Sequence, residues 1–383
     1  MENWQRGGFG LYIHWPFCAA KCPYCDFNSH VVSQVDHAEW RTALLRELAA
    51  WAELTPGRVL GSIFFGGGTP SLMAPETVAA LVSAARSHWI PANDLEVTVE
   101  ANPTSVEAGR FAEFVAAGVN RFSIGLQALN DADLRRLGRL HTAAEGRRAF
   151  DVARGLTERV SFDLIYARQD QDVTAWETEL RHALAFAGEH LSLYQLTIED
   201  GTAFGARHAA GGLSGLPDED RAVDLWTVTQ DLTQEAGLRR YETSNHARPG
   251  AEARHNLVYW RGGDWIGLGP GAHGRLTLPD GRIATEALRA PQSWLQAVDR
   301  PLATTQQERL RSADSAEEYL LMSLRTVEGT DLRHFTTLQG SLNQREAERL
   351  EADGFLCTGQ GRLRTTEAGA LLLDTILGRL ISG

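Results

Sequence analysis

Short apolar runs alternate with helical patterns from residue 9 to about residue 200. The apolar runs are rich in β-branched and aromatic residues and have the length of buried strands, whereas apolar residues recur every three or four positions in the segments between them. This alternation is typical of βα units arranged around a parallel sheet. Six units are predicted, with strands at residues 10–14, 59–65, 95–100, 121–126, 160–166 and 191–198.

The segment between the first two strands shows the helical pattern most clearly. Trp40, Leu44, Leu48 and Trp51 follow one another at three- and four-residue steps, and Asp36 stands where an N-cap residue is expected. Six βα units make three quarters of a (β/α)8 barrel, so the expected fold class is α/β with a partial, TIM-like (β/α)6 barrel. In such barrels the functional groups lie at the carboxyl ends of the strands.

The alternation ends near residue 200. The glycine-rich stretch 201–215 predicts a linker or flexible loop, followed by a long helix at 217–236 and a strand near Tyr241. From about residue 312 the pattern is mostly helical and similar to a small winged-helix module, with helices near 313–325, 332–338, 344–352 and 366–380 and a β-like turn at 355–364. The expected parts are a barrel at 1–205, an extension at 206–310 and a C-terminal domain at 311–383. Because the helix at 344–352 is as acidic as it is basic, we interpret the C-terminal domain as a lid or docking domain rather than a DNA-binding domain.

Three of the four cysteines fall within eight residues. Cys18, Cys22 and Cys25 are spaced by four and three positions, which favours thiolates that converge on one metal centre. A structural zinc site takes four ligands, usually as two separated pairs, and no second pair exists. A disulfide framework is disfavoured by the odd cluster in a large chain. The spacing therefore predicts an iron–sulfur site with one open position, and Cys357 is predicted to be a packed core residue.

Glycines and polar residues stand at the predicted strand ends. The strand at 59–65 leads into consecutive glycines and Thr69, and such glycines let the backbone approach a ligand closely. Glu100 and Gln127 follow the next two strands, and Asp163 lies in the fifth. A lone carboxylate at such a position is more often a helix cap or a surface charge, but three polar residues at one barrel mouth favour a ligand site.

Charge and hydropathy disfavour two classes of partner. The chain has 383 residues and a net charge of −12, from 37 basic and 49 acidic residues, and no dense Lys/Arg run, so nucleic acid is not expected as a partner. No apolar run approaches the ~20 residues of a membrane span. The N-terminus lacks the apolar core of a signal peptide, so a cytoplasmic location is expected, which suits free thiolates.

At the cysteines the chain resembles a known family. The pattern CxxxCxxC directly after an apolar strand resembles the radical S-adenosylmethionine (SAM) superfamily, and the string Tyr12-Ile13-His14-Trp15-Pro16-Phe17-Cys18 is similar to its anaerobic coproporphyrinogen oxidase branch, which includes the HemW haem chaperones. The resemblance implies that the three cysteines bind a [4Fe–4S] cluster whose fourth iron takes the amino and carboxylate groups of SAM. It also implies an electron donor for the cluster.

The same resemblance assigns further residues to the site. The residues matching the SAM-contacting positions of this branch are Gly67, Gly68, Thr69, Glu100, Gln127, Arg139 and Asp163, with Tyr12 near the cluster-bound end and the backbone of Tyr24 facing the adenine. One departure is local. Where the family commonly has Tyr-Gly-Leu-Pro-Gly-Gln after the fifth strand, this chain has Tyr166-Ala167-Arg168-Gln169-Asp170-Gln171, so a loop of different shape is expected.

Two functions within this branch are alternatives. One is the oxygen-independent coproporphyrinogen III oxidase, an enzyme, and the other is a haem chaperone that binds haem and delivers it to acceptor proteins. The oxidase carries a fourth cysteine two residues after the cluster motif, where this chain has Phe27, and a longer segment before the cluster. The string His255-Asn256-Leu257-Val258-Tyr259-Trp260 matches the HNxxYW motif of the chaperones, which favours haem binding.

The HNxxYW string suggests a haem ligand. An imidazole binds haem iron, and neighbouring aromatic side chains offer a surface to the macrocycle. An arbitrary histidine is more often a hydrogen-bonded core residue, but within this motif we take His255 as the iron ligand and Asn256 as the residue that orients it. The sequence leaves open whether SAM is cleaved, whether the protein is an enzyme and whether it forms a homodimer.

Overall fold

The computed structural model describes residues 3–300 and 302–381. Within these residues twelve strands form one sheet, in the order β14-β13-β12-β11-β1-β4-β5-β6-β7-β8-β10-β9. The six strands predicted from the sequence are confirmed and are parallel neighbours at the centre of this order. They are β1 (Phe9–Trp15), β4 (Val59–Gly67), β5 (Ile90–Ala101), β6 (Arg121–Gln127), β7 (Arg159–Tyr166) and β8 (His190–Gln195). The α/β fold class with a partial barrel is therefore confirmed.

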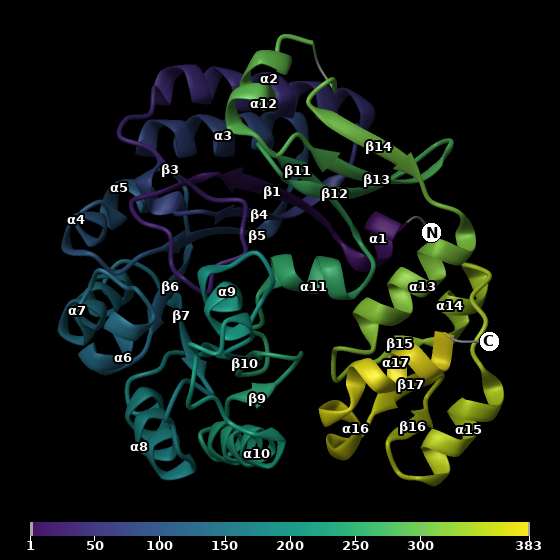
Figure 1. Cartoon of the computed structure of the whole chain (residues 1–383). Helices are drawn as coiled ribbons and strands as arrows, with labels where there is room; N and C mark the ends of the chain where they lie inside the picture. The colour runs from purple at the N-terminus through teal and green to yellow at the C-terminus, as the bar shows by residue number, and fades with distance from the viewer. Residues whose placement is uncertain (1–2, 301, 382–383) are drawn as a thin grey trace.

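Helices cover the outer side of the curved sheet (Figure 1). Those of the barrel are α2 (His37–Leu54), α3 (Pro75–His88), α4 (Ser105–Ala108), α5 (Phe111–Ala116), α6 (Asp131–Arg136), α7 (Ala143–Arg154) and α8 (Val173–Leu184). The predicted N-cap of α2 is confirmed, because the Asp36 carboxylate accepts hydrogen bonds from two backbone N–H groups of the first turn. The four apolar residues of its predicted face are buried, each burial contributing roughly 1.5–3 kcal/mol.

The cysteine loop leaves the barrel after β1 and is held by short elements. In this loop β2 (Phe17–Cys18) pairs in parallel with β3 (His30–Val31). The turn after β4 contains the 3-10 helix η1 (Pro70–Leu72), and its Thr69 N–H donates to the carbonyl of Phe17. The first cysteine is thus fixed directly beside the end of β4.

The extension continues the barrel sheet at both edges. Its strands are β9 (Arg239–Arg240), β10 (Asn245–Ala247), β11 (Asp264–Leu268), β12 (His273–Leu278), β13 (Gly281–Ala287) and β14 (Thr305–Arg309), and its helices are α10 (Glu219–Glu235), α11 (Arg254–Trp260) and α12 (Pro291–Ala297). Strand β11 pairs in parallel with β1, and β10 pairs antiparallel with β8. Buried side chains of α10, β11 and α12 belong to the same apolar core as those of the barrel. The extension and the barrel therefore form one packed unit.

The prediction of a linker or flexible loop for the glycine-rich stretch is only partly correct, because part of it forms a helix. Residues 203–209 form helix α9 (Ala203–Ala209), capped by the Thr202 hydroxyl, which accepts from the Gly205 N–H. Phe204 is buried, and its backbone N–H donates to the carbonyl of Pro23 at 2.8 Å. This helix is stabilised by its contact with the cysteine loop, which lies far away in sequence and leaves no local pattern.

The C-terminal domain has an apolar core of its own. Its elements are α13 (Ser312–Ser323), β15 (Thr330–Asp331), α14 (Leu332–Thr337), α15 (Gln344–Ala352), β16 (Leu356–Gly359), β17 (Arg362–Thr365), α16 (Glu367–Leu371) and α17 (Leu373–Ile381). Three helices and the sheet β15-β17-β16 agree with the winged-helix-like pattern. The last predicted helix is divided into α16 and α17. The barrel contributes one further short helix to this side, α1 (Asn3–Gly7), whose Arg6 pairs with Asp331 at 2.6 Å.

The prediction that Cys357 is buried is wrong. Cys357 lies on β16, where Leu356 points into the core and Cys357 is exposed. Neighbouring residues of a strand point to opposite faces, and the outer face of this small sheet is uncovered at that position. Cys357 is therefore exposed, whereas the three other cysteines are partly buried and lie more than 300 residues earlier in the sequence.

Candidate functional site

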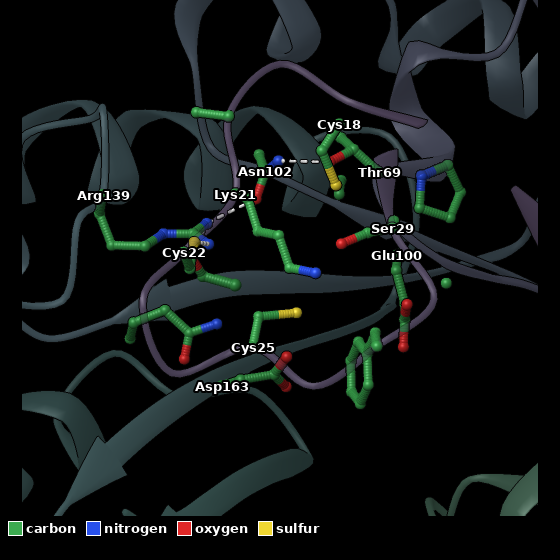
Figure 2. Close-up of a pocket in the computed structure, with 18 of the residues that line it drawn as sticks. Cys18, Lys21, Cys22, Cys25, Ser29, Thr69, Glu100, Asn102, Arg139 and Asp163 are labelled. Carbon is green, nitrogen blue, oxygen red and sulfur yellow. Dashed lines mark hydrogen bonds between the residues drawn. The ribbon is translucent and has the colours of Figure 1, made fainter. Parts of the chain in front are cut away.

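A pocket at the carboxyl ends of the barrel strands collects eleven of the predicted site residues. They are Cys18, Cys22, Tyr24, Cys25, Gly67, Gly68, Thr69, Glu100, Gln127, Arg139 and Asp163. The cysteine loop forms one wall, and the ends of β4 to β7 form the others. Figure 2 shows the three cysteine side chains around the same space as Glu100, Asp163 and Arg139. The remaining two predicted residues, Tyr12 and His255, lie elsewhere.

The three cysteines are partly buried free thiols. Burial raises the pKa of Cys18 and of Cys25, so both thiols favour the neutral form until a metal binds. The Thr69 hydroxyl donates to Cys18 Sγ at 3.4 Å, and Arg139 donates to Cys22 Sγ at 3.4 Å. Among the described residues no three potential ligands are close enough to share one metal ion.

The glycines after β4 let this strand approach the cysteine loop. Gly67 has a φ of +109°, and a Cβ built there would lie 2.7 Å from the ring of His14. A Cβ on Gly68 would lie 2.8 Å from the carbonyl oxygen of Phe17 and 3.0 Å from Cys18 Sγ. These glycines are therefore required by the protein itself, because a side chain at Gly67 would displace His14 of β1 and one at Gly68 would displace the start of the cysteine loop.

Asn102 connects the two residues that contact the cysteines. Its side-chain amide donates to Thr69 Oγ1 at 3.0 Å, and its carbonyl oxygen accepts from Arg139 (Figure 2). Arg139 also donates to the carbonyl of Gly125 at 3.2 Å. Asn102 is not among the residues predicted from the sequence, although it is the second residue after the predicted strand at 95–100. A search of the first two residues beyond each strand would have found it.

The end of β6 carries strain and unpartnered polar atoms. Gln127 has a φ of +68°, next to an irregularity in the pairing of β6 with β7. Its Oε1 atom and the Nε atom of Arg139 are buried without a hydrogen-bond partner among the described residues. Buried polar atoms are rarely left unsatisfied, and backbone strain persists where the surrounding structure enforces it. Both features fit a pocket that is completed by a polar ligand such as SAM.

Two buried carboxyls face the pocket from neighbouring strands. Burial and the nearby Asp163 raise the pKa of Glu100 to about 8, and burial raises the pKa of Asp163 to about 6. Asp163 accepts a hydrogen bond from the Ser123 hydroxyl at 3.1 Å. At neutral pH the Glu100 carboxyl is therefore mostly protonated and can donate a hydrogen bond, whereas Asp163 is mostly ionised.

Tyr12 and His255 lie behind these carboxyls, in an inner chamber of the barrel. The chamber shares Glu100, Ser123 and Asp163 with the cysteine-lined pocket, so the two spaces adjoin. The Tyr12 hydroxyl is 3.0 Å from His14 Nδ1. Tyr12 therefore lines the inner chamber and not the cysteine-lined pocket.

His255 is a buried residue with both ring nitrogens hydrogen-bonded. Its Nδ1 lies 2.8 Å from the Ser62 hydroxyl, and its Nε2 lies 2.6 Å from the Tyr259 hydroxyl. The side chain is 1% exposed, and burial lowers its pKa to about 3, so the ring is neutral. A neutral imidazole is the form that binds iron. In this conformation, however, Nε2, the nitrogen that would bind iron, is hydrogen-bonded to the Tyr259 hydroxyl.

The loop after β7 keeps a glycine-like backbone without glycine. Ala167 and Asp170 both have a φ of 58°, at the two positions where the resembled family has glycines. Arg168, between them, is buried and pairs with Asp133 at 2.9 Å and with Glu179. Both residues thus have a left-handed backbone conformation that glycine adopts more easily. The buried arginine explains how two residues remain in a region that costs of order 1–3 kcal/mol each.

Comparisons with known proteins agree with this geometry. The model of the radical SAM superfamily matches residues 12–172, and that of the HemN C-terminal domain matches residues 310–372. The heme chaperone HemW of Escherichia coli is 40% identical over 96% of this chain and 96% of its own length. The chain belongs to the HemW family of radical SAM proteins. A mitochondrial relative from Mus musculus, radical S-adenosyl methionine domain-containing protein 1, is 41% identical over 97% of this chain and 87% of its own length.

The HemW family shares its fold with a solved oxidase structure. Coproporphyrinogen III oxidase (HemN) from Escherichia coli, described as a radical SAM enzyme, superposes with a TM-score of 0.81 over 98% of this chain and 90% of its own, at 22% identity. At that identity the likeness shows the fold alone. A radical SAM domain implies a [4Fe–4S] cluster and SAM, and the pocket described above has the thiols and polar groups to receive both. None of the described helices is both long and apolar enough to cross a membrane.

Proposed function

We propose that this protein binds haem and transfers it to haem-requiring acceptor proteins, with a [4Fe–4S] cluster and SAM bound in the barrel pocket. The observation that carries the proposal is the position of the HNxxYW helix. In a chain 40% identical to a protein named heme chaperone, α11 places His255, Asn256 and Tyr259 on the wall of a chamber that adjoins the cysteine-lined pocket. The motif and the cysteine loop thus line two adjoining spaces that share Glu100, Ser123 and Asp163.

In this proposal the cysteines of the pocket bind the cluster, and its glycines and polar residues bind SAM. Cys18, Cys22 and Cys25 would hold the cluster, which when reduced supplies the electron for reductive cleavage of SAM. Arg139 would place a positive charge beside the carboxylate of SAM, and Gln127 would satisfy its free Oε1 with a donor on the ligand. The protonated Glu100 would donate a hydrogen bond, while Gly67, Gly68, Thr69, Asp163 and the backbone of Tyr24 would complete the cradle, with Tyr12 behind it.

Haem ligation by His255 requires a local opening. The imidazole would exchange its hydrogen bond with Tyr259 for a bond to iron, and Ser62 would keep the other ring nitrogen oriented. Helix α11 is only seven residues long, so its displacement breaks few backbone hydrogen bonds. Access to His255 thus depends on movement of one short element.

The test is the absorption spectrum of the anaerobically reconstituted protein with haemin, compared between two histidine variants. His255→Ala should shift or weaken the Soret band and leave iron and sulfide content unchanged. His246→Ala is the matched control, because His246 is also 1% exposed but lies on β10 outside the motif. A spectrum that responds equally to both substitutions, or to neither, contradicts the assignment of His255.

The oxidase is tested in parallel. Phe27 occupies the position of the oxidase's fourth cysteine, lines the pocket and is 58% exposed. Anaerobic incubation with coproporphyrinogen III, SAM and a reductant should therefore give no protoporphyrinogen at an enzymatic rate. Formation of that product would replace the chaperone proposal by the oxidase.

The partners of the proposal follow from its chemistry. An electron donor must reduce the cluster, and haem-requiring proteins must accept the haem. A reducing compartment such as the cytoplasm suits three free thiolates. Pull-down of a haem-requiring protein that gains haem from the loaded chaperone would support this part, and failure of haem to leave the chaperone would contradict it.

A further inference from the structure

A second cavity lies where α11 meets the C-terminal domain. Its volume is about 270 Å³, and it shares no lining residue with the cysteine-lined pocket or the inner chamber. The lining comes from α1, the end of α11, α13 with the loop that follows it, and β17. In Figure 1 α1, α11 and α13 lie where the barrel faces the C-terminal domain. We call this space the junction cavity.

The junction cavity has one arginine more than it has carboxylates to pair. Arg6, Arg261, Arg362 and Glu328 line it. Arg6 pairs with Asp331 at 2.6 Å, and Arg261 pairs with Glu328 at 2.5 Å. Arg362 makes no ion pair within the described residues and donates instead to the carbonyls of Glu328 and Gly329, at 3.4 and 3.0 Å. In a chain of net charge −12, an unpaired guanidinium held in place by carbonyls favours an anionic ligand.

Trp260 provides a second free donor in the same cavity. Its indole Nε1 atom is buried and has no hydrogen-bond partner among the described residues. Buried donors of this kind are normally satisfied, and a carboxylate can accept from an indole N–H and a guanidinium together. Two independent features, an unpaired cation and an unpartnered N–H, thus call for the same kind of ligand.

The HNxxYW helix borders both spaces. His255 and Tyr259 line the inner chamber, whereas Trp260 lines the junction cavity. Successive residues on a helix point about 100° apart, because each turn has 3.6 residues. Tyr259 and Trp260, which are neighbours in sequence, therefore face different spaces on two sides of α11.

The junction cavity is large enough for one substituent of a large anionic ligand but not for the whole molecule. Pockets that enclose a whole drug-sized molecule span about 300–1,000 Å³, so a cavity of about 270 Å³ suits an arm rather than a macrocycle. We propose that the junction cavity receives a carboxylate of a haem propionate, held by Arg362 and the Trp260 N–H. This inference rests on the proposed haem-binding function.

The test compares haemin with haemin dimethyl ester, in which the propionates carry no charge, on the full-length reconstituted protein. Wild type should bind haemin more tightly than the ester, by on the order of tenfold, because hydrogen bonds to a charged group are lost in the ester. Arg362→Gln should abolish that preference, and Trp260→Phe should reduce it while keeping an aromatic ring. In all variants the affinity for the ester should stay close to that of wild type.

Arg364→Gln is the matched control. Arg364 lies on the same strand β17 and donates to the same carbonyl of Glu328, at 3.1 Å, but does not line the cavity. It should keep the wild-type preference, and thermal melting of each variant identifies any loss of folding. Haemin bound with no preference over the ester, or a preference that survives both Arg362→Gln and Trp260→Phe, overturns the junction inference alone. Absence of haemin binding by wild type overturns the proposed function as well.

Discussion

Glu100 and Asp163 lie within the barrel where water cannot solvate both charges. Because burial raises the pKa of Glu100 to about 8 from its ordinary 4.5, the folded protein binds a proton at this site that the unfolded chain has released between these pH values. The free energy of unfolding therefore falls as pH rises through that window. A ligand that accepts a hydrogen bond from the protonated carboxyl of Glu100 favours that neutral form further.

Glu100→Gln should accordingly stabilise the cluster-free, SAM-free protein at pH 8, by on the order of 4 kcal/mol, and the gain should vanish towards pH 4.5. Thermal denaturation across this range measures it. Glu53→Gln, at an exposed position of α2, is the control and should change the melting temperature equally at all pH values. A gain from Glu100→Gln that does not depend on pH would contradict the raised pKa.

The cysteines differ in what each can bind. Cys22→Ala should lose cluster iron, because it removes one thiolate from the cysteine-lined pocket, whereas Cys357→Ala should keep the full content, because Cys357 is exposed on β16. Iron and sulfide are counted after anaerobic reconstitution. Full iron in Cys22→Ala, or loss of iron in Cys357→Ala, would count against the three-cysteine site.

At the scale of elements, the short helix α9 supports the cysteine loop. Phe204 is 2% exposed, its ring centroid lies 6.4 Å from that of Tyr24, and its N–H donates to the loop carbonyl of Pro23. A seven-residue helix is too short to be stable alone. Helix and loop therefore depend on each other, which ties cluster retention to a segment some 180 residues away.

Phe204→Ala should destabilise the protein by about 3–5 kcal/mol and also speed the loss of iron to a chelator. Phe335→Ala is the matched control, because Phe335 is 4% exposed in the separate core of the C-terminal domain. It should cost similar stability without changing iron release. Equal rates of iron loss in the two variants would show that α9 does not support the loop.

For the whole molecule, a buried ion network joins the extension to the barrel. Asp264 on β11 is fully buried and contacts Arg58 at 2.7 Å and Arg282 at 3.2 Å. These arginines come from the segment before β4 and from β13. The network thus links β11 and β13 of the extension to the segment before β4, which is distant from them in sequence.

Asp264→Ala should lower the free energy of unfolding by about 3–5 kcal/mol, because it removes the carboxylate that pairs with the buried Arg58 and leaves Arg282 only the more distant Glu318, at 4.0 Å. Asp280→Ala removes an exposed partner of Arg309 and should cost about 0–1 kcal/mol. Urea unfolding distinguishes the two. Similar small losses in both variants would mean that solvent reaches the network.

The sequence by itself determined what depends on neighbouring residues. The spacing of Cys18, Cys22 and Cys25 predicts a cluster loop, apolar periodicity located six parallel strands, and Asp36 marked the start of α2. The polar residues at the strand ends could be expected to meet, since parallel strands that are neighbours in a barrel place their carboxyl ends at one mouth. Spacing, periodicity and capping each depend on residues that are close together in the sequence, so they can be recognised without the fold.

Only the tertiary structure decided what depends on distant segments becoming neighbours. The pairing of β11 with β1, the folding of α9 against the cysteine loop and the bridging role of Asn102 follow from contacts that no local pattern encodes. The wrong prediction for Cys357 has the same cause. Whether its face of β16 is covered depends on how the described elements pack, and in the folded domain Cys357 is exposed. His255 shows the division most clearly: the motif identifies the residue, but whether its nitrogen is free depends on Tyr259 and Ser62, which the folded barrel brings to it.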